Sequence, residues 1–335
     1  MTPPAAGATT RPRHSVAARH VALLGGTTDA GDCLTVLGYL LRPARLVRGP
    51  QVRAFEQLFA ERVGTRYGYS FAAGRVGLYG VLQALGVGAG DEVLLGVPTH
   101  VVVANAVRYT GARPVYVDCD PETYTMDLAD AERRVGPATR AIILEHTFGI
   151  PVDVDAALAL ARMHGLSVIE DCVHALGSTW RGRPVGSARY ARRLSNAQAA
   201  LGVRQLRRLD ANAAHRCATT ALIEQRLSGH GFRLPQPPAE ADPVYVRYPV
   251  EVPDRVAAVA ATAAHAVLGT WFTSVLEEAA APTLVGYESG SCPHAEMVAR
   301  HLVNIPTHPR VRGSDVDAIV TALSVTAPSE ATPDV

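Results

Sequence analysis

The apolar residues of this chain switch repeatedly between helical and strand-like spacing, a pattern typical of βα units rather than of an all-helical or all-β protein. One helix is predicted between Pro50 and Gly64, which are residues typical of a helix start and a helix end. The same pattern predicts helices at 76–85, 100–111, 127–135 and 154–165, and strands at 92–97, 113–118, 141–145 and 166–171. The fold class is therefore α/β, with a mainly parallel sheet flanked by helices.

The second half of the chain predicts a smaller α+β part. A long helical stretch over 194–227 precedes a strand at 244–250, a helix at 254–268 and a final helix at 314–323. We expect a large α/β domain over residues 21–200, and a long helix with a small C-terminal domain over 201–326. The polar ends, residues 1–20 and 327–335, are expected to be disordered.

All 32 basic residues among the 335 are arginines, because the chain contains no lysine. They balance 31 acidic residues, so charge gives no reason to expect nucleic acid or a membrane as partner. The five cysteines form no CxxC pair, which favours a reducing, cytoplasmic location and predicts neither a disulfide framework nor a zinc site. A GC-rich genome explains arginine in place of lysine at most surface positions, but it does not explain a catalytic position.

Ligands of a doubly wound parallel sheet bind outside the carboxyl ends of its strands, so those ends supply candidate site residues. The predicted ends carry Pro98, Thr99, His100, Asp118, Glu145, His146, Glu170 and Asp171. Gly74 adds a second signal, because a glycine before a helix exposes backbone N–H groups to an anion.

Four stretches carry a resemblance to a known family. They are GVGAGDEVLLGVPTH from Gly86, HTFGIPVD from His146, LSVIEDCVHALGSTW from Leu166 and HLVNIPTHPRV from His301. Their order over residues 49–322 resembles the sugar aminotransferases of the DegT/StrS type, which are pyridoxal phosphate (PLP) enzymes of fold type I. The resemblance implies a fold type I scaffold and a small-molecule ligand.

The same resemblance implies roles for individual positions. Asp171 matches the carboxylate that pairs with the pyridine nitrogen of the cofactor, and His174 matches a residue that contacts its ring oxygen. His100 matches the aromatic ring that stacks on the pyridine. The implied cofactor-binding residues are Gly74, Arg75, Val76, His100, Asp171 and His174.

The chain departs from the family after Gly186 and Ser187, where relatives carry several dozen residues that include the Schiff-base lysine. Ala191 stands where relatives have an asparagine that reaches the phosphate of a neighbouring subunit. An arginine guanidinium stays protonated and does not replace the lysine amine. We therefore expect a sheet narrowed by an internal deletion, no covalent cofactor, and PLP or its aminated form (PMP) bound non-covalently if at all.

Three functions fit these observations. The chain is an accessory, non-transaminating protein of bacterial amino-sugar or natural-product biosynthesis, or it holds PLP or PMP non-covalently. Alternatively, Glu145, His146 and His174 are catalytic residues that perform acid–base chemistry on a small phosphorylated or carboxylate substrate. The expected partner is a second copy, or a complete homologue in a heterodimer, that covers the shortened sheet.

Simpler interpretations remain open for the same residues. His146 and His174 also fit buried, hydrogen-bonded core histidines, and Asp171 fits a strand-end carboxylate bound by local N–H groups. A gene shortened to an inactive product is a further alternative. No metal is predicted, because the spacing of the histidines and carboxylates is not diagnostic.

Overall fold

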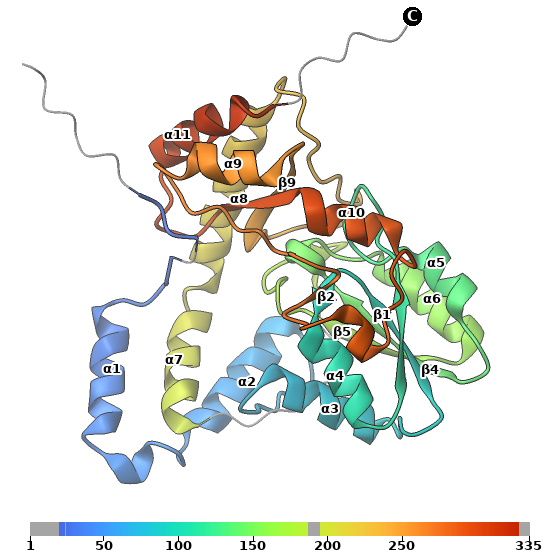
Figure 1. Cartoon of the computed structure of the whole chain (residues 1–335). Coiled ribbons are helices and arrows are strands. Elements are labelled where there is room, and N and C mark those ends of the chain that lie inside the picture. The colour runs from blue at the N-terminus through green and yellow to red at the C-terminus, as the bar shows by residue number, and fades with distance from the viewer. Residues whose placement is uncertain (1–19, 24, 187–194, 328–335) are drawn as a thin grey trace, which may run out of the picture.

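A four-stranded parallel sheet forms the centre of the large domain (Figure 1). The computed structural model describes residues 20–23, 25–186 and 195–327, so the arm before His20, most of the C-terminal tail and Ala191 lie outside the described residues. The sheet consists, in spatial order, of β3 (Arg113–Val117), β1 (Glu92–Gly96), β4 (Thr139–Glu145) and β5 (Ser167–Asp171). This arrangement confirms the predicted α/β class and its strands.

Helices cover both faces of this sheet because alternate strand residues point to opposite sides. Leu94, Ile142 and Leu144 pack in one buried cluster with α5 (Leu128–Arg134) and α6 (Val154–His164). The strand residues that alternate with these, such as Val93, Leu95 and Ile143, point to the other face of the sheet. They pack in a larger buried cluster with α3 (Gly74–Ala84) and α4 (Val101–Tyr109). Each fully buried aliphatic side chain stabilises the fold by about 1.5–3 kcal/mol relative to exposure.

Pro50, Gly64 and Asp127 lie at helix ends, as the sequence predicted. Helix α2 (Gln51–Val63) follows Pro50 and ends at Gly64, whose φ of 72° is in the left-handed region that favours glycine. Asp127 caps α5 because its carboxylate accepts the backbone N–H groups of Ala129 and Asp130.

The C-terminal part is built on a two-stranded antiparallel sheet, of which the second strand was not predicted. Its elements are β9 (Arg247–Glu251), β11 (Leu302–Pro306), α8 (Leu209–Leu227), α9 (Arg255–Thr262), η3 (Pro282–Val285), α10 (Pro293–His301) and α11 (Gly313–Ser324). The strand predicted at 244–250 begins only at Arg247. The helix predicted at 254–268 was too long, because the chain beyond Thr262 pairs with the N-terminal segment: Val21 donates to the His265 carbonyl, and Val267 donates to that of Val21.

A lobe of helices extends away from the sheet in Figure 1. It contains α1 (Ala30–Leu40), which was not predicted, together with η1 (Pro43–Arg45), α2 and α7 (Asn196–Leu206). The predicted helical stretch 194–227 is divided into α7 and α8 at Arg207 and Arg208. Asp32 is fully buried between α1 and α7, where it accepts hydrogen bonds from Arg204 and Arg208.

Short strands complete the architecture. They are β2 (Thr99–His100), paired with β10 (Leu276–Glu277), and β6 (Thr179–Trp180), paired with β7 (Arg183–Pro184) and β8 (Ala241–Asp242). The other short helix, η2 (Thr147–Gly149), follows β4 directly. In the described part of the chain, no helix combines the length and the apolar character needed to cross a membrane.

Candidate functional site

Two carboxyl groups lie side by side at the carboxyl ends of the central strands. Glu145, the last residue of β4, is the register partner of Asp171, the last residue of β5. Thr99 in β2 donates its hydroxyl to Glu145, so three of the predicted strand ends come together at one point. This grouping is what the parallel topology predicts.

The surroundings of Glu145 disfavour the ionised form of its side chain. Its side chain is buried, and burial together with the neighbouring charge of Asp171 raises the pKa of Glu145 well above its usual value. Asp171 is less buried, and its Oδ1 accepts the backbone N–H of Val173 at 3.1 Å.

His174 follows Asp171 by three residues and is a buried, neutral imidazole. Its ring centroid is 4.7 Å from that of Trp271, and the residue is only 9% exposed. Burial and the positive field of Arg247 and His100 lower the pKa of His174 to about 4. A neutral ring of this kind can either donate or accept a hydrogen bond to a ligand.

His100 is held in place from two sides. Its Nδ1 accepts the backbone N–H of Val102 at 3.2 Å at the start of α4, and its Nε2 lies 3.1 Å from the Glu278 carboxylate. Glu278 follows β10, so a segment of the C-terminal part crosses the strand ends and fixes this ring. About a quarter of the His100 side chain remains exposed, which leaves room for contact with a ligand.

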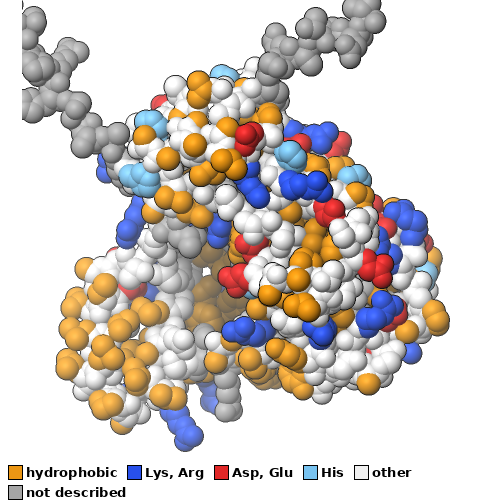
Figure 2. Space-filling model, in the orientation of Figure 1, with side chains coloured by type: hydrophobic (Ala, Val, Ile, Leu, Met, Phe, Trp, Pro, Cys, Tyr) orange, Lys and Arg blue, Asp and Glu red, His pale blue; other side chains and the backbone are white. Residues whose placement is uncertain are grey.

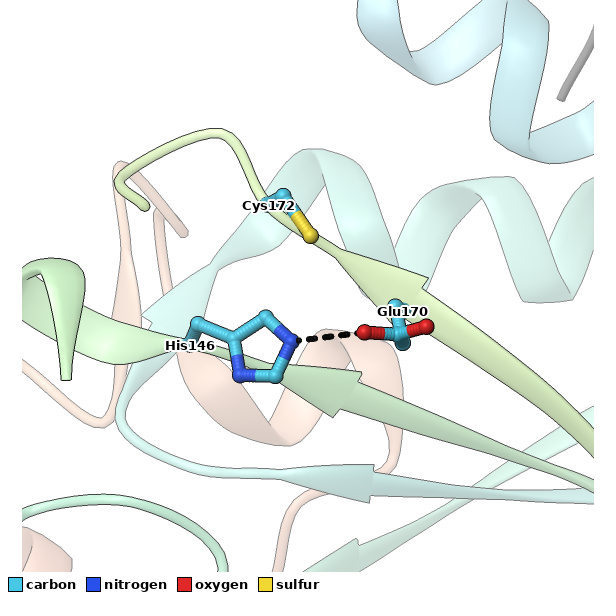
Figure 3. Close-up of side chains that lie close together, drawn as sticks. All are labelled: His146, Glu170 and Cys172. Atoms are coloured by element: carbon cyan, nitrogen blue, oxygen red, sulfur yellow. Dashed lines mark hydrogen bonds and ion pairs between the residues drawn. The ribbon is translucent and has the colours of Figure 1, made fainter. Parts of the chain in front are cut away.

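His146, Glu170 and Cys172 form a compact cluster beside this site (Figure 3). One potential ligand atom from each lies within 4.8 Å of the other two, which is the spacing of a metal site. However, the His146 Nδ1 accepts the backbone N–H of Val152 at 3.0 Å, so the ring proton is on Nε2 and points toward Glu170, 3.2 Å away. Nε2 then has no lone pair for a metal, and the cluster is better explained as a buried hydrogen-bonded histidine that orients Glu170.

The environment of Cys172 disfavours the thiolate form of its side chain. Burial and the charges of Glu170 and Asp171 raise its pKa well above the usual value. Its sulfur lies opposite Gly186, where an added Cβ would come within 2.9 Å of it. The position therefore has a packing role.

Gly149 lets its own loop come into close contact with the backbone of Val244 and of His174. Its φ is +100°, and a Cβ at this position would lie 2.3 Å from the Val244 carbonyl oxygen and 3.1 Å from that of His174. Ser178 fastens the same junction, because its hydroxyl donates to the Gly149 carbonyl and accepts the N–H of Val244. The loops after β4 and β5 and the approach to β9 are thus locked together.

The predicted phosphate loop forms the first turn of α3. Gly74, Arg75 and Val76 are exposed there, and Ala73 supplies no side-chain cap to the first N–H groups. An uncapped helix start of this kind suits an anionic group. The part these three residues play in binding a cofactor stays a prediction, as do the roles implied for His100, Asp171 and His174.

Sequence reasoning missed the residues that the C-terminal part contributes to the site. They are Trp271, Glu278 and Arg247, whose guanidinium lies over the Trp271 ring at 4.3 Å. Trp271 is one of only two tryptophans in the chain, and this rarity was the available signal. No local pattern indicates that residues so far along the chain return to the strand ends.

With this geometry established, comparison with known proteins identifies the family. Residues 34–191 and 188–324 match the DegT/DnrJ/EryC1/StrS aminotransferase family, and the chain belongs to it. The crystal structure of DesV from S. venezuelae superimposes with a TM-score of 0.82 at 25% identity, covering 88% of this chain and 94% of that one. Structural neighbours include PLP and PMP forms, and PLP is the cofactor that the family implies.

Two curated relatives are similar to this chain over part of their length. The UDP-N-acetyl-3-dehydro-alpha-D-glucosamine 3-aminotransferase of Acidithiobacillus ferrooxidans is 42% identical over 156 residues, which are 47% of this chain and 42% of the relative. The GDP-perosamine synthase of Caulobacter vibrioides is 32% identical over 235 residues, with 55% of this chain and 63% of the relative covered. The matched stretches therefore span less than two thirds of either relative.

Proposed function

We propose that this chain is a non-transaminating member of the family that holds PLP or PMP without a covalent bond and acts in bacterial amino-sugar or natural-product biosynthesis. One observation carries the proposal: a chain without any lysine keeps Glu145 and Asp171 side by side at its strand ends, with the buried His174 three residues further along the chain. The covalent link of this cofactor requires a primary amine, and a guanidinium that stays protonated does not provide one.

The alignments support a missing internal segment at the expected place. The family match is divided into two parts that meet at residues 188–191, directly after Gly186 and Ser187. The alignment with the Caulobacter enzyme extends over 235 residues although it uses only 55% of this chain, as expected if the relative carries several dozen residues without counterpart here. The missing lysine would belong to that segment.

The site fits non-covalent binding of the cofactor. Asp171 can pair with a protonated pyridine nitrogen, and the raised pKa of the neighbouring Glu145 disfavours a second negative charge there. His174 offers a neutral imidazole, and the uncapped start of α3 offers N–H groups to a phosphate. When bound, the pyridine ring supplies an electron sink. The residues of this chain bind and orient it.

A second candidate function rests on the burial of Glu145 beside Asp171, which raises the pKa of Glu145. A buried carboxyl group whose pKa is raised beside a second carboxyl group is an arrangement used for general acid and general base catalysis. The site would then perform proton transfer on a small phosphorylated or carboxylate substrate, without any cofactor. Glu145→Gln would abolish such an activity, whereas it would leave non-covalent binding of PLP largely intact.

The partner we propose is a second copy of the chain or a complete homologue. Leu34, Leu37, Leu40 and Leu41 expose half or more of their surface on α1 and at its end, and hydrophobic side chains cover much of this lobe in Figure 2. Several large apolar side chains exposed together on one helix favour burial against another protein.

An amino-donor assay tests the proposal. The purified chain is incubated with PLP and glutamate, and 2-oxoglutarate is measured beside a lysine-bearing member of the family under the same conditions. We expect product from the lysine-bearing enzyme and none from this chain. Formation of 2-oxoglutarate by this chain faster than by PLP and glutamate without protein would overturn the proposal.

A further inference from the structure

Arg247 extends the strand-end site onto the C-terminal sheet. It is the first residue of β9, and its guanidinium carbon lies 4.3 Å from the centre of the Trp271 ring. The same ring contacts His174, whose centroid is 4.7 Å away. Arg247, Trp271 and His174 therefore form one continuous group.

The guanidinium of Arg247 has no anionic partner within the described part of the chain. It forms neither a hydrogen bond nor an ion pair there, and its Nε is buried without any acceptor. Glu277 is near enough to favour the charged form of Arg247, but its carboxylate accepts the backbone N–H and hydroxyl of Thr273. A partly buried guanidinium without a carboxylate is costly, because arginine does not give up its charge.

Neighbouring groups increase the positive field at this point. Arg216 of α8 lies close enough that its charge and that of Arg247 oppose each other, and burial lowers the pKa of both. Arg216 is itself fixed, because it donates to the Val246 carbonyl at 2.7 Å and to the Thr307 hydroxyl at 2.8 Å. The arginine without a partner is thus Arg247, held by the Trp271 ring.

We propose that Arg247 is a binding residue for the carboxylate or phosphate group of a small-molecule ligand in the strand-end site. A guanidinium held by stacking presents its donors as a fork, which matches the paired oxygens of either group. This inference rests on the proposed function of the site and adds the chemical class of the ligand. Arg247 would bind an acidic group of the ligand, whereas Asp171 would bind the pyridine nitrogen of the cofactor.

Trp271 provides a direct readout. Replacement of the other tryptophan, Trp180→Phe, leaves Trp271 as the only tryptophan in the chain, so its fluorescence reports events at Arg247. This variant is titrated with glutarate, inorganic phosphate and the neutral diamide of glutarate. We expect a saturable change with glutarate or phosphate and none with the diamide, and the comparison of the two anions distinguishes a carboxylate from a phosphate ligand.

Substitutions at Arg247 complete the test. We expect Arg247→Gln to weaken anion binding at least about tenfold and Arg247→Lys to weaken it less, because a charged hydrogen-bond pair is lost in the first and the charge is kept in the second. Arg233→Gln is the matched control. Arg233 is exposed and forms an ion pair with Glu251, which lies in β9 with Arg247. Equal binding by Arg247→Gln, or no saturable response of the parent protein to any anion, would overturn the inference.

The same variants separate this inference from the proposed function. Loss of the anion response with PLP binding retained in Arg247→Gln supports both. Absence of PLP binding, together with an anion response that depends on Arg247, overturns the proposed function and keeps the inference. Because Arg247→Lys preserves the charge over Trp271, it remains informative if Arg247→Gln does not fold.

Discussion

His174 links the chemistry of the site to the stability of the fold. Burial, Arg247 and His100 lower its pKa to about 4, whereas an unfolded histidine titrates near 6.5. Between pH 4 and pH 6.5 the His174 imidazole is protonated in the unfolded chain but not in the folded chain. Stability is therefore fully present above about pH 6.5 and falls as the pH decreases toward 4, by about 3 kcal/mol in total.

Replacement of His174 tests this account. We expect His174→Gln to reduce the fall in unfolding free energy between about pH 6.5 and pH 4 by about 3 kcal/mol, measured by urea denaturation at both values. His230→Gln serves as the control because His230 is exposed at the end of α8. An unchanged pH dependence in His174→Gln would show that this imidazole is not held neutral.

The sequence predicted single residues well where their role is local. Gly64 and Asp127 end and begin helices through their own backbone or side chain, so their signals are contained within a few positions. Arg247 and Trp271 have no such signal. Their role depends on contact with each other and with His174, which lies nearly a hundred residues away from Trp271 in the sequence.

At the scale of elements, the junction at Gly149 holds the loops after β4 and β5 against the start of β9. We expect Gly149→Ala to cost about 3 kcal/mol, because it adds the strain of a positive φ to a clash with the Val244 carbonyl. Gly165→Ala is the matched control, since Gly165 also has a positive φ but faces open space, and it should cost about 1 kcal/mol. Thermal unfolding measures both, and similar losses would contradict the packing role of Gly149.

The element boundaries that the sequence mispredicted are those set by distant partners. The helix expected to reach residue 268 stops at Thr262 because the following backbone pairs with Val21, an interaction between opposite ends of the chain. The pairing of β2 with β10 is of the same kind. Apolar periodicity reports which face of an element is buried, but it does not report which segment covers it.

At the scale of the whole molecule, the helical lobe exposes several large apolar side chains of α1 that a partner protein would bury. We predict that the protein associates through it and that Leu37→Asp with Leu41→Asp shifts the sedimentation coefficient to that of a monomer, because charged groups oppose burial. Val256→Asp places the same charge on an exposed valine of α9 and should leave the coefficient unchanged. A parent protein that sediments as a monomer would contradict the prediction.

The central claim concerns how the chain holds its cofactor, and one titration tests it most directly. Absorbance of the purified protein is followed during addition of PLP and of PMP, and borohydride treatment with mass analysis then detects any covalent adduct. The account predicts saturable binding without an adduct, weakened at least about tenfold by Asp171→Asn and unchanged by Asp210→Asn at an exposed carboxylate. A borohydride-stable adduct on the protein, or the absence of saturable binding, would contradict it.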